Sequence, residues 1–141
     1  MPQGSVLGPK LYSLYTKPLA DILDNTGSRN HFFADDTQLW QSFELRCEES
    51  KEQAVQGIES SVSEAQKWMA KNKLKCNADK TEMLVITPKS KTTEITIRID
   101  GIEVRSADCV QNLGIFQDSH LTFERQVNQV CRAANFHLRR I

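Results

Sequence analysis

The stretch His31-Phe32-Phe33-Ala34-Asp35-Asp36-Thr37-Gln38-Leu39-Trp40 places a pair of aspartates between two runs of aromatic and β-favouring residues. Residues of these kinds are enriched in strands. The two runs are short, and aspartate is a common turn residue. We therefore predict a β-hairpin whose arms cover residues 31–34 and 37–43 and whose tip carries Asp35 and Asp36.

Adjacent carboxylates between apolar residues carry an electrostatic cost, because like charges repel and apolar surroundings remove water from them. A divalent cation offsets this cost. Mg²⁺ takes hard oxygen ligands, usually one or two carboxylates together with the phosphates of a substrate. Asp35 and Asp36 are therefore candidates for half of a phosphoryl-transfer site. A solvated surface turn explains the same dipeptide, so the dipeptide alone leaves both interpretations open.

Two amphipathic helices are expected on either side of this hairpin. The first covers residues 11–23, with Pro9 in its first turn and Pro18 inside it, where Pro18 should bend the helix or end its first half. The second should begin at the capping box Ser50-Lys51-Glu52-Gln53 and stop near Asn72. The predicted buried stripes are Leu11, Leu14, Tyr15, Leu19, Ile22 and Leu23 in the first helix and Ala54, Ile58, Val62, Ala65, Trp68 and Met69 in the second.

Strand and turn signals follow each other in the second half of the chain. A strand is expected over residues 83–87, and isoleucines that alternate on both sides of Asp100-Gly101 predict a hairpin with a two-residue turn. Another short strand is expected over residues 109–113. Thr122 should cap a last helix. The predicted buried face of that helix holds Phe123, Val127, Val130, Cys131, Ala134 and Leu138. We predict an α+β fold in which helices pack against antiparallel strands.

The length of 141 residues fits one compact domain, and 39% hydrophobic with 26% charged residues is ordinary for a globular protein. Because 18 basic residues balance 18 acidic ones, no overall charge attracts the chain to nucleic acid, and any such contact must be local. The four cysteines are widely spaced, so we expect free thiols. No apolar run approaches the roughly 20 residues that span a bilayer, so we expect an intracellular protein with no membrane partner.

Four longer blocks stand in order along the chain. They are Pro2-Gln3-Gly4-Ser5-Val6-Leu7-Gly8-Pro9, then Phe33-Ala34-Asp35-Asp36-Thr37-Gln38-Leu39, then Leu74-Lys75-Cys76-Asn77-Ala78-Asp79-Lys80-Thr81-Glu82-Met83, and finally Val110-Gln111-Asn112-Leu113-Gly114-Ile115 with Leu121-Thr122-Phe123 after it. Together they resemble the reverse transcriptases of non-LTR (LINE-type) retrotransposons. The resemblance implies an RNA-directed DNA polymerase, with an RNA template, a DNA primer and dNTP as partners and two Mg²⁺ ions as cofactors.

The resemblance also assigns chemistry to three residues. Asp35 and Asp36 match the catalytic aspartate pair that helps hold the two Mg²⁺ ions. Since neighbouring side chains in extended backbone point to opposite sides, we expect Asp35 to bind metal directly and Asp36 to act more through its charge. Lys80 matches a basic position with a general-acid role toward pyrophosphate. A solvated, lysine-rich helix end explains Lys80 equally well.

The resemblance also assigns nucleic-acid-binding roles to five residues. Pro2, Gln3 and Gly4 match the block that lines the nucleotide and the template strand, where a residue without Cβ lets backbone approach the nucleic acid closely. A turn before a helix is compatible with that role. Leu113 and Gly114 match the primer-grip turn, which supports the primer backbone without reading bases.

The resemblance implies that residues 1–115 are part of a reverse-transcriptase palm and that residues 116–141 are the helical start of a thumb. The family's third carboxylate, on a strand before the Pro-Gln-Gly segment, and its fingers have no counterpart in this sequence. Lys10 also stands where the family has an apolar residue. Because catalysis by positioning tolerates only small errors, we expect the isolated chain to be inactive.

Two further interpretations stay open. A degenerate, non-catalytic remnant of a mobile element, with weak affinity for nucleic acid, would inherit the same blocks. A helical scaffold would instead use the helices expected over residues 50–72 and 121–141 to bind a protein partner. Asp35 and Asp36 favour the polymerase lineage over the scaffold, but they do not separate a working polymerase from a decayed one.

Overall fold

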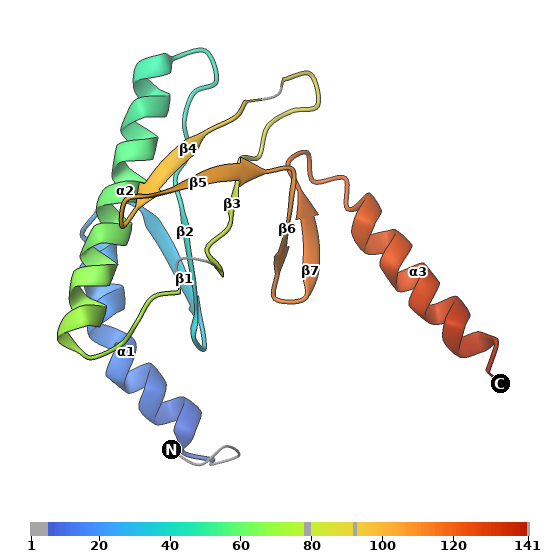
Figure 1. Cartoon of the computed structure of the whole chain (residues 1–141), viewed down its shortest axis with the longest axis horizontal. Coiled ribbons are helices and arrows are strands. Elements are labelled where there is room, and N and C mark those ends of the chain that lie inside the picture. Colours follow the sequence, from blue (N-terminus) through green and yellow to red (C-terminus); the bar gives the residue numbers. More distant parts are fainter. Residues whose placement is uncertain (1–5, 78–79, 92, 141) are drawn as a thin grey trace. The chain divides into compact units, whose positions relative to one another are not determined.

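The computed structural model describes residues 6–77, 80–91 and 93–140, which form helices and short strands (Figure 1). Their order is α1 (Gly8–Asp24), β1 (Arg29–Phe33), β2 (Asp36–Trp40), α2 (Glu48–Lys71), β3 (Met83–Leu84), β4 (Thr96–Ile99), β5 (Ile102–Ala107), β6 (Cys109–Asn112), β7 (Ile115–Asp118) and α3 (Glu124–Leu138). The chain divides into two compact units, residues 1–78 with 97–102 and residues 79–96 with 103–141. The chain therefore contains both helices and strands, as predicted.

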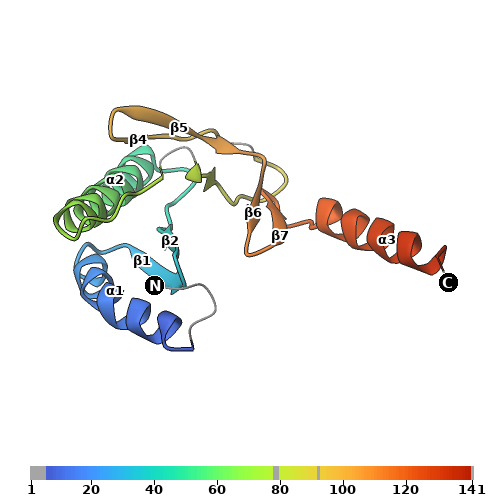
Figure 2. The same cartoon turned by 60° about the horizontal axis from the view of Figure 1, so that its bottom comes forward.

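In the first unit, α1 and α2 pack against each other and against the β1–β2 hairpin (Figures 1 and 2). A cluster of hydrophobic side chains lies at the centre of this packing. Its buried members are Leu19, Leu23 and Ala65, and Phe32, Leu39, Trp68 and Met69 pack around them. Burial of one leucine side chain contributes about 2 kcal/mol, so these contacts fix the hairpin on the helices.

The buried face of α1 is narrower than predicted. Leu19 and Leu23 are buried, but three other members of the predicted stripe are 47% or more exposed because the two-stranded hairpin covers only one strip of the helix. Those three are Leu11, Leu14 and Tyr15. The helix also continues through Pro18 to Asp24, so termination at Pro18 is wrong. An internal proline costs about 3 kcal/mol, which the burial of the leucines after it offsets.

The start of α2 corrects the predicted capping box. The helix begins at Glu48, and its N-cap Cys47 makes no side-chain capping bond. Ser50 lies inside the first turn, where its hydroxyl accepts a hydrogen bond from the backbone N–H of Glu44 at 3.0 Å. The hydroxyl therefore fastens the preceding loop and does not cap the helix. The predicted stop is confirmed, because Asn72 is the C-cap.

The strands form three small sheets, β1–β2, β3–β5–β4 and β6–β7. β1–β2 and β6–β7 are antiparallel, but β3 runs parallel to β5, so the prediction of antiparallel strands is wrong for β3. β3 is also shorter than the predicted strand over residues 83–87. The reason is that the chain leaves the sheet after Leu84, and Thr87 donates its backbone N–H to the carbonyl of Ser119 at 2.9 Å.

Two tight turns contain pairs of residues with positive φ. Asp100 and Gly101 have φ of 51° and 79° between β4 and β5, which confirms the predicted two-residue turn. Leu113 and Gly114 have φ of 48° and 81° between β6 and β7. Positive φ at both central residues is typical of the turn that matches strand twist in short hairpins. The strand predicted over residues 109–113 therefore ends at Asn112 and returns as β7.

No residue of α3 is buried, so the predicted buried face of this helix is wrong. The expected cap is wrong as well, since the N-cap is Phe123 and not Thr122. The carboxylate of Asp118 instead accepts the backbone N–H groups of His120, Thr122 and Phe123 and the Thr122 hydroxyl. The backbone bond from Thr122 is the largest cause that lowers the pKa of Asp118 from 3.8 to about 2. Asp118 thus ties β7 to the start of α3.

The four cysteines are free, as predicted. No helix in the described part of the chain is long and apolar enough to cross a membrane. The boundary between palm and thumb at residues 115 and 116 stays a prediction.

Candidate metal centre

The acidic tip is built by the turn between β1 and β2. The two strands pair so that Phe33 lies opposite Asp36, which leaves Ala34 and Asp35 as the turn residues. The turn therefore begins one residue earlier than predicted, and Asp36 opens β2. Ala34 has φ of 54°, a left-handed conformation that costs an alanine about 1 kcal/mol. The core beneath the hairpin holds this strained turn in place.

The two aspartates leave the tip from different positions. Asp36 is the cross-strand partner of Phe33, so their side chains share one face of the hairpin. Phe32 and Leu39 occupy the other face and pack against the core. Asp35 follows Ala34 in the turn itself. Both aspartates are exposed, so water and phosphate oxygens have access to both carboxylates.

Tyr12 is the side chain of α1 that interacts electrostatically with this tip. Its phenol is half-buried, and burial is the larger cause that raises the pKa of Tyr12 above 10.0. The negative charge of Asp35 raises the same pKa further. Tyr12 was not predicted as a site residue, although it lies seven and eleven residues before Leu19 and Leu23, a spacing that places all three on one helix face.

The donor set fits a weakly held, hydrated Mg²⁺. Within residues 6–77, 80–91 and 93–140, no group of three histidine, cysteine, aspartate or glutamate side chains could hold a metal ion. The pair Asp35 and Asp36 therefore offers one or two carboxylates. This is the number that Mg²⁺ commonly takes from a protein when phosphates and water supply its other ligands.

The remaining predicted site residues either belong to the second unit or are outside the described residues. Pro2, Gln3 and Gly4 are outside the described residues. Lys80 is exposed, and it belongs to the second unit together with Leu113 and Gly114, which form the β6–β7 turn. Asp35 and Asp36 belong to the first unit. The roles of Lys80, Leu113, Gly114 and the Pro-Gln-Gly segment stay predictions.

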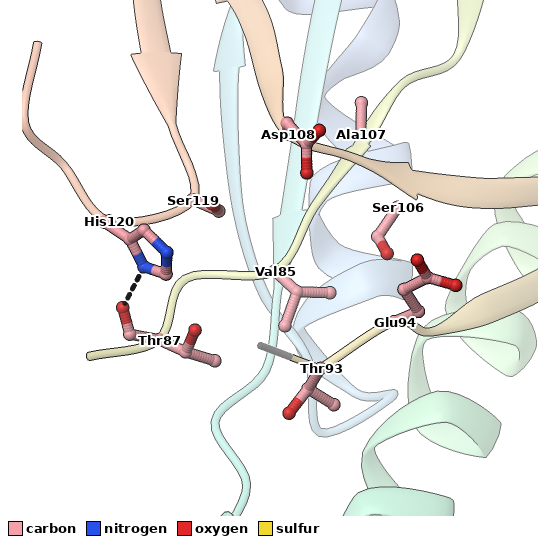
Figure 3. A pocket seen from close by; sticks show the side chains of 9 residues that line it. All are labelled: Val85, Thr87, Thr93, Glu94, Ser106, Ala107, Asp108, Ser119 and His120. Carbon is pink, nitrogen blue, oxygen red and sulfur yellow. Dashed lines mark hydrogen bonds between the residues drawn. The ribbon is translucent and has the colours of Figure 1, made fainter. Parts of the chain in front are cut away.

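A polar pocket of about 230 Å³ lies within the second unit (Figure 3). Its hydrogen bonds go mainly to backbone: His120 pairs through Nδ1 with the Thr87 carbonyl at 2.9 Å, and the Thr87 hydroxyl donates to the Lys91 carbonyl at 2.8 Å. The Ser106 hydroxyl accepts the backbone N–H of Ile95 at 3.1 Å. These contacts hold the segments around β3 together, so we assign the pocket a structural role.

Comparisons with known proteins agree on one family. Residues 1–116 match the family model described as reverse transcriptase (RNA-dependent DNA polymerase). In Drosophila melanogaster, the chain is 30% identical over 132 residues to the probable RNA-directed DNA polymerase from transposon X-element. It is 27% identical over 139 residues to the RNA-directed DNA polymerase from mobile element jockey.

A third relative, the probable RNA-directed DNA polymerase from transposon BS of the same organism, is 31% identical over 129 residues. The three alignments cover 92%, 94% and 87% of this chain. The chain spans only 14% of the length of each relative. No solved structure matches the chain significantly.

Proposed function

Because the chain belongs to the reverse transcriptase family, in the branch of non-LTR retrotransposons, we propose that it is part of the palm of an RNA-directed DNA polymerase. The proposed reaction joins a dNTP to the 3′-hydroxyl of a DNA primer on an RNA template. Residues 1–115 are proposed as palm and residues 116–141 as the start of the thumb. The chain alone is proposed to be inactive, since its described residues offer at most two metal ligands.

The acidic tip is the observation that carries this proposal. A strained two-residue turn presents Asp35 and Asp36 to solvent, and the buried leucines of α1 fix the hairpin that holds them. We propose Asp35 as a direct ligand of Mg²⁺ and Asp36 as its neighbouring negative charge. When bound, the metal would polarise the primer hydroxyl and neutralise the leaving pyrophosphate. The protein's part is to hold the two carboxylates still.

The other site residues keep the roles that the family implies. Lys80 is proposed as a proton donor to pyrophosphate, a role suited to an exposed ammonium group. Leu113 and Gly114 are proposed to support the primer backbone, and their tight, exposed turn lets a phosphate chain approach closely. Pro2, Gln3 and Gly4 are proposed to line the nucleotide and the template.

The charge on α3 supports contact with nucleic acid. Arg125, Arg132 and Arg139 are spaced by seven residues, which places them along one side of the helix about 10 Å apart. Glu124 is the one acidic residue in the helix. Val127, Val130, Ala134 and Leu138 lie on the opposite side of the helix, so the arginine side is suited to phosphates. We propose that this side of the thumb start contacts the backbone of the RNA or the primer.

A chimera tests the proposed activity. Residues 1–141 would replace the aligned part of the X-element relative, and primer extension on poly(rA)·oligo(dT) with Mg²⁺ would measure dTTP incorporation. We expect the chimera to extend the primer and Asp35→Asn to reduce the rate at least about 100-fold, the equivalent of roughly 3 kcal/mol of transition-state stabilisation. The 141-residue chain alone should incorporate nothing.

Asp21→Asn is the matched control, because it removes an exposed carboxylate from the side of α1 and leaves the tip unchanged. It should extend the primer like the parent chimera. Equal activity of Asp35→Asn and Asp21→Asn would contradict the metal-binding role of Asp35. A parent chimera without activity, beside an active X-element enzyme, would favour the degenerate remnant.

A further inference from the structure

One side of α1 packs on the hairpin through two leucines. Tyr12, Thr16, Leu19 and Leu23 are spaced by four, three and four residues, which places them on the same side of the helix. The two leucines are buried against Phe32 and Leu39, and Tyr12 and Thr16 are half-buried. Tyr12 therefore continues, toward the start of the helix, the strip on which the hairpin packs.

Chain lengths place Tyr12 opposite the acidic tip. Asn30 donates its side-chain N–H to the carboxylate of Asp24 at 2.7 Å, so the base of the hairpin lies at the end of α1. From Asp24 back to Tyr12 the helix rises about 18 Å, at about 1.5 Å per residue. From Asn30 to Asp35 the strand advances about 17 Å, at about 3.3 Å per residue. Figures 1 and 2 show the hairpin running back along α1 toward its first turns.

The Tyr12 hydroxyl is available for a further contact. The backbone carbonyl of Tyr12 accepts a hydrogen bond from the Thr16 hydroxyl at 3.0 Å. Within the part of the chain that the structure describes, the phenolic hydroxyl of Tyr12 makes no hydrogen bond. Tyr15 differs, because its hydroxyl donates to the carbonyl of Asn72 at 2.9 Å. A phenolic O–H donates hydrogen bonds and an ionised carboxylate accepts them, so the Asp35 carboxylate is a possible acceptor for the Tyr12 hydroxyl.

We propose that Tyr12 is a positioning residue of the metal site, whose hydroxyl donates a hydrogen bond to Asp35 when Asp35 binds a divalent cation. A carboxylate that binds a metal through one oxygen keeps its other oxygen free to accept a hydrogen bond. Such outer contacts orient the ligand, and their loss typically weakens metal binding by about 10- to 100-fold. The inference rests on the proposed function, because it requires that Asp35 binds metal.

A titration of the 141-residue chain with Mn²⁺ tests the proposal without enzyme activity. Bound Mn²⁺ broadens nearby NMR signals, so the backbone amide signals of Asp35 and Asp36 report on occupancy of the tip. We expect Tyr12→Phe, which keeps the ring, to raise the apparent dissociation constant for Mn²⁺ by about tenfold. Tyr15→Phe, which also removes one phenolic hydroxyl from α1, should leave it unchanged.

Asp35→Asn separates the metal-binding role of Asp35 from the positioning role of Tyr12. If it abolishes broadening at the tip while Tyr12→Phe titrates like the parent chain, the metal site stands and the role of Tyr12 is refuted. If the parent chain shows no broadening at the tip, the metal-binding function itself fails in this chain. Unchanged amide signals around Leu19 and Leu23 would show that Tyr12→Phe leaves the core intact. If Tyr12→Leu weakens Mn²⁺ binding and Tyr12→Phe does not, the ring and not the hydroxyl acts, which also overturns the proposal.

Discussion

Ser61→Ala should destabilise the first unit even though it deletes a single oxygen atom. Ser61 is fully buried in α2, and its hydroxyl lies 2.7 Å from the Thr26 hydroxyl, 2.8 Å from the Ser28 hydroxyl and 2.8 Å from the Gly57 carbonyl. The bonds to Thr26 and Ser28 join α2 to the loop between α1 and the hairpin, and the bond to Gly57 lies within α2. Thr26 keeps a second acceptor, the Leu23 carbonyl at 2.7 Å, so it is not left unpaired.

The change in the free energy of unfolding for Ser61→Ala combines two opposing contributions. Loss of about two hydrogen bonds, at about 1 kcal/mol each, lowers the free energy of unfolding, and the better helix propensity of alanine returns up to about 0.5 kcal/mol. We therefore expect a net loss of about 1.5 kcal/mol. Ser60→Ala is the matched control, because Ser60 is exposed on the same helix and should gain only the propensity contribution.

Urea unfolding followed by tryptophan fluorescence measures this difference. Trp40 and Trp68, the two tryptophans of the sequence, both belong to the first unit, so the signal reports on that unit. The midpoint should fall for Ser61→Ala and rise slightly for Ser60→Ala. Equal stability of the two variants would refute the argument that the buried hydroxyl cluster contributes to the packing of α2 on the hairpin.

Three further predictions concern other parts of the chain. Leu23→Ala should lower the free energy of unfolding by about 3 kcal/mol in the same fluorescence assay, because Leu23 is fully buried. Leu14→Ala, at a position 67% exposed, should change it by less than about 0.5 kcal/mol. Similar losses in the two variants would disprove the assigned core. The lowered pKa of Asp118 stabilises the fold above about pH 3.8, and this contribution is lost as the pH falls toward about 2. Amide exchange at the start of α3 should therefore rise as the pH falls through that window. Asp118→Asn should remove this pH dependence. Arg132→Gln should weaken RNA binding and reduce its salt-dependence slope by about 1; an unchanged slope would exclude a phosphate contact.

Patterns that depend on neighbouring residues predicted the local structure well. The β-favouring residues around Asp35 predicted the acidic hairpin, and Asp100-Gly101 predicted the turn between β4 and β5, because both signals act within a few residues. The turn at the tip was predicted one residue too late. Strand pairing sets that position, since Phe33 pairs with Asp36 and leaves Ala34 to adopt the strained conformation.

Features that depend on contacts outside a short motif were not predictable in the same way. Ser50 matched a capping signal, but its hydroxyl accepts a hydrogen bond from Glu44 in the preceding loop, a contact that the capping motif does not encode. Ser61 is buried because Thr26 and Ser28 meet it across the fold, and a polar residue gives no apolar signal of burial. The negative charge of Asp35 raises the pKa of Tyr12 because the hairpin folds back along α1, which no local motif encodes.

The most direct test of the metal-binding role locates the metal itself. Crystals of the 141-residue chain, grown or soaked with MnCl₂, would be used to record anomalous scattering from Mn²⁺ as a stand-in for Mg²⁺. The account predicts an anomalous peak within coordination distance of a carboxylate oxygen of Asp35, at the hairpin tip that Asp36 shares. Manganese bound only at other acidic residues, with the tip of the hairpin empty at saturating metal, would contradict it.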